Sequence, residues 1–130
     1  MRFLCLYKPS KPEGTPPTQQ EMDAMGKLIE DGMKSGSLIS TEGCLPSAKG
    51  ARVRLSGGKY TVTDGPFTES KELVAGFAII QAKSKEEAIE ATKNFLKVAG
   101  DGETEIRQVF EATDFAPENY SSEYKKAANQ

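Results

Sequence analysis

The chain contains no histidine, and only two of its 130 residues are cysteines, Cys5 and Cys44. Without histidine, a histidine-ligated zinc site and a Ser-His-Asp triad are both excluded. The two cysteines lack the Cys-x-x-Cys spacing of zinc and redox sites. We therefore expect free thiols, no metal site and no cofactor.

Long apolar runs and long basic runs are also missing. No stretch approaches the ~20 apolar residues of a membrane-spanning helix, and the apolar start, residues 3–7, is too short and wrongly flanked for a signal peptide. The 17 basic and 19 acidic residues leave a net charge of −2, with no basic run that could follow a phosphate backbone. We expect a cytoplasmic protein that binds neither membranes nor nucleic acid.

The apolar residues that are present mark strands and helices in a chain of single-domain length. Residues 2–8 and 73–82 are apolar at both alternating sets of positions, which is typical of central strands covered on two sides. Helices are predicted where a capping box precedes apolar residues at helical spacing. The expected elements are strands 2–8, 37–44, 51–55, 59–63, 73–82 and 105–111, and helices 18–35 and 84–100.

This order indicates an α+β fold, a ferredoxin-like βαββαβ chain with an inserted β-hairpin. We expect the domain to occupy residues 1–113 and to leave residues 114–130 as a polar, peripheral tail. Right-handed connections place both helices on one face of the sheet. The other face is still apolar at alternate positions, and large apolar patches usually mark contact surfaces, so we expect a homodimer packed sheet against sheet.

Two segments near the amino terminus each leave two interpretations open. The proline-rich residues 9–17 form neither helix nor strand, and they either cover a cleft or serve as a solvated linker. Met22, Met25 and Met33 lie on one face of the first predicted helix. They form either an adaptable binding surface or an ordinary core stripe.

Polar and charged side chains are concentrated in residues 62–72, where Gly65-Pro66 forces the chain to turn. The run Asp-Gly-Pro-Phe-Thr-Glu-Ser-Lys-Glu at residues 64–72 resembles the signature of the YCII-related family, in particular its DGPF branch. Looser matches are Glu42-Gly43, Arg54, Gly76-Phe77 and residues 105–107. The resemblance covers most of residues 1–111 and implies a dimeric α+β barrel of ferredoxin-like subunits.

The same loop and its neighbours supply candidate acids and bases. Carboxylates crowded in a cleft can have one pKa raised toward neutrality, which provides a general acid or base without histidine. Asp64 is the candidate catalytic residue, and we expect it to face one cleft together with Arg54. The candidate substrate-binding residues are Arg54, Glu42, Phe67, Glu69 and Lys71. This set suits a cofactor-independent enzyme of the proton-transfer type, similar to isomerases and lyases, acting on an anionic or enolic small molecule.

Structural roles explain the same residues. Asp64 before Gly65-Pro66 also suits a turn, and Phe67 also suits a core anchor. Glu69 and Lys71 could form solvated ion pairs, and Arg54 could pair across strands. Some relatives carry a His-Asp pair proposed as catalytic, of which this chain has only the Asp. The alternative is therefore a non-catalytic binding or accessory protein, with a regulatory role implied by the association of DGPF-family genes with alternative sigma factors.

Overall fold

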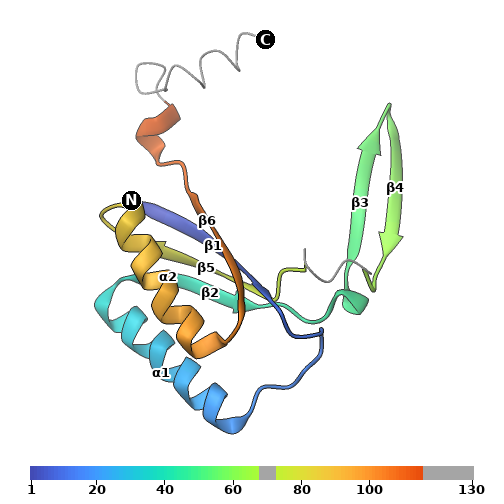
Figure 1. Ribbon diagram of the computed structural model, residues 1–130. Helices are drawn as coiled ribbons and strands as arrows, with labels where there is room; N and C mark the ends of the chain where they lie inside the picture. The colour runs from blue at the N-terminus through green and yellow to red at the C-terminus, as the bar shows by residue number, and fades with distance from the viewer. Residues whose placement is uncertain (68–72, 116–130) are drawn as a thin grey trace.

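A computed structural model describes residues 1–67 and 73–115 of the chain. The elements follow the predicted order and form an α+β, ferredoxin-like fold with an inserted hairpin (Figure 1). In chain order they are β1 (Arg2–Pro9), α1 (Gln19–Ser35), β2 (Leu38–Gly43), the 3-10 turn η1 (Ser47–Lys49), β3 (Ala51–Ser56), β4 (Lys59–Asp64), β5 (Gly76–Gln81), α2 (Lys85–Ala99), β6 (Gly102–Gln108) and the 3-10 turn η3 (Ala112–Phe115). Strand β6 begins earlier than expected because Gly102 already pairs with Pro9 of β1.

Both helices begin where the sequence predicts. The Thr18 side chain accepts a hydrogen bond from the Glu21 N–H at 3.1 Å, and the Ser84 side chain accepts one from the Glu87 N–H at 3.1 Å. These bonds satisfy backbone donors that would otherwise be unpaired in the first turn. The predicted N-caps at Thr18 and Ser84 are thereby confirmed.

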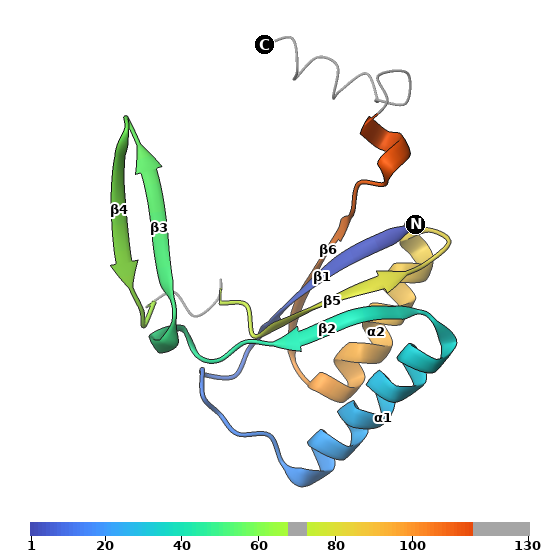
Figure 2. The ribbon, with the colours of Figure 1, turned by 180° about the vertical axis from the view of Figure 1, so that it is seen from behind.

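The main sheet has four antiparallel strands in the order β2-β5-β1-β6. Both helices lie on one side of it, as Figures 1 and 2 show from opposite directions. Strand β5 separates β1 from β2, which holds Cys5 and Cys44 apart, and both cysteines are free. The ferredoxin-like strand order is therefore present.

Strand register assigns the apolar residues to two faces of this sheet. Cys5 lies opposite Ala78 and Tyr7 lies opposite Thr104, on the face that α1 and α2 cover. The intervening pairs point the other way. They are Leu4 with Ile79 and Leu6 with Phe77. We call this second side the open face, because within residues 1–67 and 73–115 no helix covers it (Figures 1 and 2).

The β3–β4 hairpin forms a separate two-stranded sheet that stands apart from the main sheet and away from the helices (Figures 1 and 2). Gly57 and Gly58 both have positive φ, as a two-residue hairpin turn requires. One hairpin face carries apolar side chains that remain between 59% and 70% exposed. They are Val53, Leu55, Tyr60 and Val62. A lone hairpin is only marginally stable in water, so this face calls for a partner.

Four residues fasten the base of the hairpin to the rest of the chain, and we call them the clip: Glu13, Ser47, Gly65 and Phe67. The Ser47 Oγ accepts a hydrogen bond from the Phe67 N–H at 3.0 Å and donates one to Glu13 Oε2 at 2.6 Å. The Ser47 N–H donates to the other Glu13 oxygen at 2.7 Å. The Gly65-Pro66 bond is cis, and a Cβ on Gly65 would overlap the carbonyl oxygen of Ser47. Glycine is required there by close packing.

We predict that Gly65→Ala opens the clip. The added methyl must displace the Ser47 backbone, and overpacking of this kind costs about 1–3 kcal/mol, so amide exchange at Gly65 and Phe67 should accelerate about tenfold or more. Gly50→Ala is the control, because Gly50 has extended backbone angles and a Cβ there would sit at an ordinary 3.5 Å from the Ser47 oxygen. Hydrogen exchange followed by NMR measures both. Equal protection in the two variants would show that close packing at Gly65 does not hold the clip.

Candidate functional site

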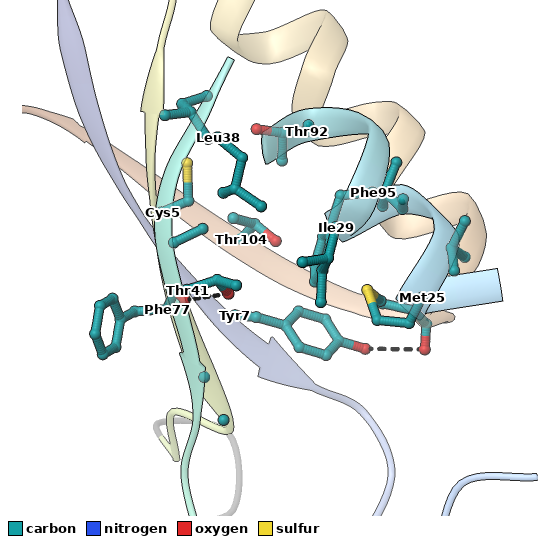
Figure 3. A pocket seen from close by; sticks show the side chains of 18 of the residues that line it. Cys5, Tyr7, Met25, Ile29, Leu38, Thr41, Phe77, Thr92, Phe95 and Thr104 are labelled. Carbon is teal, nitrogen blue, oxygen red and sulfur yellow. Dashed lines mark hydrogen bonds between the residues drawn. The ribbon is translucent and has the colours of Figure 1, made fainter. Parts of the chain in front are cut away.

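A pocket of about 600 Å³ lies between the sheet and the two helices, where a packed core would be expected (Figure 3). Among the described residues, the buried ones are few and small apart from one aromatic. They are Phe3, Cys5, Gly76, Ala82, Ala88 and Thr92. Pockets of 300–1,000 Å³ are typical of small-molecule sites. This hollow is the best candidate site in the part of the chain that the structure describes.

Most of the pocket wall is apolar. Met25 and Ile29 extend from α1, and Phe95 extends from α2, toward the sheet (Figure 3). The Phe95 ring meets the Tyr7 ring edge to face, with centroids 5.1 Å apart. Of the methionine stripe, Met22 and Met25 line the pocket, whereas Met33 is not among the lining residues. The binding-surface interpretation therefore fits two of the three methionines.

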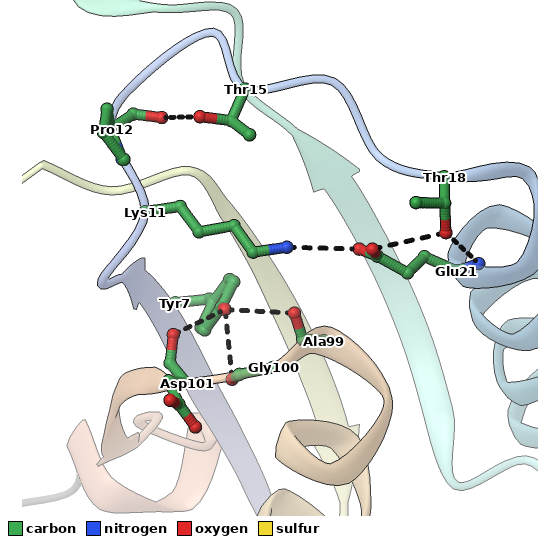
Figure 4. Close-up of polar contacts among 9 residues, drawn as sticks. All are labelled: Tyr7, Lys11, Pro12, Thr15, Thr18, Glu21, Ala99, Gly100 and Asp101. Carbon is green, nitrogen blue, oxygen red and sulfur yellow. Dashed lines mark hydrogen bonds and ion pairs between the residues drawn. The ribbon is translucent and has the colours of Figure 1, made fainter.

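Tyr7 is the principal hydrogen-bonding group of the wall. Its Oη lies 3.3–3.4 Å from the carbonyl oxygens of Ala99, Gly100 and Asp101 (Figure 4). Burial raises the pKa of Tyr7, and the negative charges of Asp101 and Glu21 raise it further. The hydroxyl thus stays protonated, and its single proton can serve only one of the three carbonyls at a time.

Three threonines add neutral hydroxyls to the wall. Thr41 Oγ1 donates to the Phe77 carbonyl and Thr92 Oγ1 donates to the Ala88 carbonyl, both at 2.8 Å. Thr104 Oγ1 is buried and has no hydrogen-bond partner among the described residues. Buried polar atoms are nearly always paired, so this oxygen is a candidate contact for a polar group of a ligand.

The mouth of the pocket is bordered by the segment between β1 and α1. Pro17 and Glu21 belong to the lining, and Lys11 Nζ lies 3.3 Å from Glu21 Oε2 (Figure 4). The hydrogen bond from Lys11 is the main cause that lowers the pKa of Glu21, with its positive charge and Thr18 adding to it. Of residues 9–17, Pro17 alone is among the described lining residues, so the segment reaches the edge of the pocket, and whether it covers the pocket stays a prediction.

Cys5 lies deep in the pocket and is 8% exposed. Burial raises the pKa of its thiol, and a smaller opposing effect comes from its hydrogen bond with Thr92. A thiol that keeps its proton reacts slowly. Cys44, in contrast, is exposed.

The predicted residues of the Asp64 loop lie elsewhere. Asp64 is exposed at the end of β4 and pairs with Ala51, whereas Arg54 pairs with Thr61. Because side chains alternate along a strand, this register puts Asp64 and Arg54 on opposite faces of the hairpin. The expectation that they face one cleft is not met, and neither belongs to the pocket lining.

The remaining predicted residues are dispersed. Phe67 is half-buried, and the centre of its ring lies 4.0 Å from the guanidinium carbon of Arg52, a residue that was not singled out from the sequence. Glu42 borders the pocket at the end of β2, but its pairing with Phe77 turns its side chain to the open face. Glu69 and Lys71 lie outside the described residues.

Sequence reasoning missed the polar groups of the pocket. Cys5 and Tyr7 alternate with Leu4 and Leu6 in β1. The sequence signal that could have revealed them is that one of the two alternating sets of β1 positions carries a thiol and a hydroxyl, whereas Leu4 and Leu6 in the other set are apolar. Within residues 1–67 and 73–115 no cluster of three or more His, Cys, Asp or Glu side chains could hold a metal ion. Over the same residues no helix is long and apolar enough to cross a membrane.

Comparison with known proteins gives a curated relative, a solved structure and a family. An uncharacterised protein of Rhizobium meliloti (strain 1021) is 34% identical over 62 residues, which are 48% of this chain and 50% of that protein. The match therefore spans about half the length of this relative. The structure of 5-chloro-2-hydroxyhydroquinone dehydrochlorinase from Burkholderia phenoliruptrix, in complex with 2,5-dihydroxybenzoquinone, aligns with a TM-score of 0.48 at 18% identity, over 87% of this chain and 97% of that one. The YCII-related domain matches residues 1–113, and the chain belongs to the YCII-related family.

Proposed function

We propose that this protein binds a small organic molecule in the pocket between its sheet and its two helices. The observation that carries the proposal is the pocket of about 600 Å³ at the centre of the chain. Protein interiors normally pack with few voids larger than a water molecule. An apolar hollow of this size gains stability from an occupant that restores the missing contacts.

Binding without catalysis fits the pocket better than proton transfer does. An effective general acid or base has a pKa near the working pH. Glu21 has a lowered pKa and is paired with Lys11, while Tyr7 has a raised pKa and keeps its proton. Neither group is poised for proton exchange at neutral pH, so an accessory or regulatory binding protein is the role we propose. Two free thiols suit a reducing compartment, and we place the protein in the cytoplasm.

A metabolite library screened by thermal shift tests this proposal. A true ligand at ~100 times its dissociation constant stabilises the folded protein by about 2.7 kcal/mol. Met25→Trp should reduce the shift, because the larger side chain takes up part of the pocket into which Met25 points (Figure 3). Ala24→Trp, at an exposed α1 position outside the lining, should leave the shift intact. A ligand that stabilises Met25→Trp as well as the wild type would bind elsewhere.

Proton transfer through Asp64 stays a separate proposal with its own test. Asn replaces Asp in turns with little loss, so Asp64→Asn removes the titratable group and keeps the turn. Since Asp64 is exposed and outside the pocket lining, we expect ligand affinity to stay within about twofold of wild type, as for a surface change away from the site. Isothermal titration with a ligand from the screen measures this. A tenfold loss of affinity would assign Asp64 to the site.

We also propose that the protein is a homodimer packed through the open face. Leu4, Leu6, Phe77 and Ile79 form an apolar surface there, and the apolar side of the hairpin adds a second one. A second copy related by a twofold axis is self-complementary, so it can cover the same surface on both subunits at once. Soluble proteins seldom leave such surfaces in water.

Sedimentation velocity at low micromolar concentration should therefore show a dimer. Leu6→Glu should produce a monomer, because the interface would have to bury an unpaired charge. Leu45→Glu is the matched control, since Leu45 is 75% exposed and lies outside the open face. A compact wild-type monomer would contradict the proposed assembly.

A further inference from the structure

We infer that the pocket selects an uncharged ligand with an apolar body and one polar group, and discriminates against anions. The inference rests on the proposed binding function and adds the chemical class of the ligand. Of the expectation, drawn from Arg54 and Lys71, that the substrate is anionic or enolic, it rejects the anionic part.

The charges around the pocket are the first argument. Among the described residues that line it there is no Lys or Arg, and the ionised residues are the acids Glu21 and Glu42. The nearest lysine contact is Lys11, whose charge is engaged by Glu21 at 3.3 Å. An anion that entered would lose its hydration without gaining a cationic partner, which is strongly unfavourable.

A cationic ligand is disfavoured for the complementary reason. Glu21 already has a cationic partner at the mouth, and the Glu42 side chain faces the other side of the sheet. The described interior thus offers hydroxyls, a thiol and carbonyl oxygens, but no unpaired carboxylate. Neutral hydrogen-bonding groups of this kind fit a neutral ligand.

Tyr7 and Thr104 supply the hydroxyls that can form hydrogen bonds with the polar group of the ligand. These two residues lie directly opposite each other in the β1–β6 pairing, so both side chains leave the sheet on the pocket side, with the Thr104 hydroxyl near the sheet and the Tyr7 hydroxyl farther out, against the 99–101 carbonyls. The Tyr7 oxygen retains lone pairs that can accept a hydrogen bond, and Thr104 Oγ1 has no partner of its own. Met25, Ile29 and Phe95 then face the apolar body of the ligand from the helices (Figure 3).

Two fluorescent probes that differ by one charged group test the inference. N-phenyl-1-naphthylamine is uncharged, and 8-anilino-1-naphthalenesulfonate carries the same rings with a sulfonate. Each is titrated into the Cys44→Ser protein, and alkylation of Cys5 by iodoacetamide reports whether the probe occupies the pocket. The uncharged probe at ~10 times its dissociation constant should slow alkylation about tenfold by mass action. The sulfonate should bind at this site at least about tenfold more weakly, the penalty expected for a desolvated anion without a partner.

Further variants locate the effect. Met25→Trp should weaken both the saturable fluorescence of the uncharged probe and the protection of Cys5, because it narrows the pocket, whereas Ala24→Trp should leave them unchanged. Glu21→Gln removes the carboxylate that pairs with Lys11, so the charge of Lys11 at the mouth is no longer neutralised. This change should reduce the difference in affinity between the uncharged probe and the sulfonate.

The outcomes separate the ligand class from the binding function. If the sulfonate protects Cys5 as well as the uncharged probe does, the pocket binds ligands but the inferred class is wrong. If neither probe protects Cys5, or protection is unchanged in Met25→Trp, the pocket does not take a ligand and the proposed function fails with it.

Discussion

A four-stranded sheet that is apolar on both faces, of which α1 and α2 cover one, is the constraint on which the rest of this structure depends. On the helix side, α2 packs against the sheet through Ala88, which joins Phe3 in the buried core cluster. The pocket occupies the remaining space between the sheet and the two helices. The shortage of large buried side chains there is what creates the pocket. On the other side, no helix of residues 1–67 or 73–115 covers the sheet, and this uncovered face is the basis of the proposed dimer.

Residues of the family signature, Gly65 and Phe67, hold the base of the hairpin against the 3-10 turn η1. Gly65 is small enough to lie against the Ser47 carbonyl, and the Phe67 N–H bonds to the Ser47 hydroxyl. The Ser47 hydroxyl also donates a hydrogen bond to Glu13, which belongs to the segment between β1 and α1. Pro17 of the same segment lines the pocket. The signature therefore joins the hairpin base to the segment at the pocket mouth, without contributing a described residue to the pocket wall.

Electrostatics and packing lead to the same description of the pocket. Of its two acids, Glu21 is paired with Lys11 at the mouth and Glu42 turns its side chain to the open face, and the interior hydroxyls are neutral. Burial holds the protons on Tyr7 and Cys5, so the interior carries no charge from them near neutral pH. A chain that evolved a site for an anionic substrate would place a guanidinium or ammonium group here. Arg52 instead stacks on Phe67 at the hairpin base.

The sequence by itself determined the features that depend on neighbouring residues. The N-caps at Thr18 and Ser84 involve partners three residues away, and the glycine turn at Gly57 involves adjacent ones. Alternation in β1 was enough to predict a central strand, and the order of elements was enough to predict the ferredoxin-like plan.

Tertiary structure decided everything that joins distant segments or depends on strand register. The Glu13 contact with Ser47 spans 34 positions, and no local pattern encodes it. Asp64 and Arg54 were expected together because they are close in the chain, yet the pairing of Asp64 with Ala51 sends them to opposite faces. The pocket could not be predicted from the sequence for a related reason. An apolar stripe on a helix predicts that this face is buried. The distance between the helix and the sheet, however, depends on the size of every side chain between them.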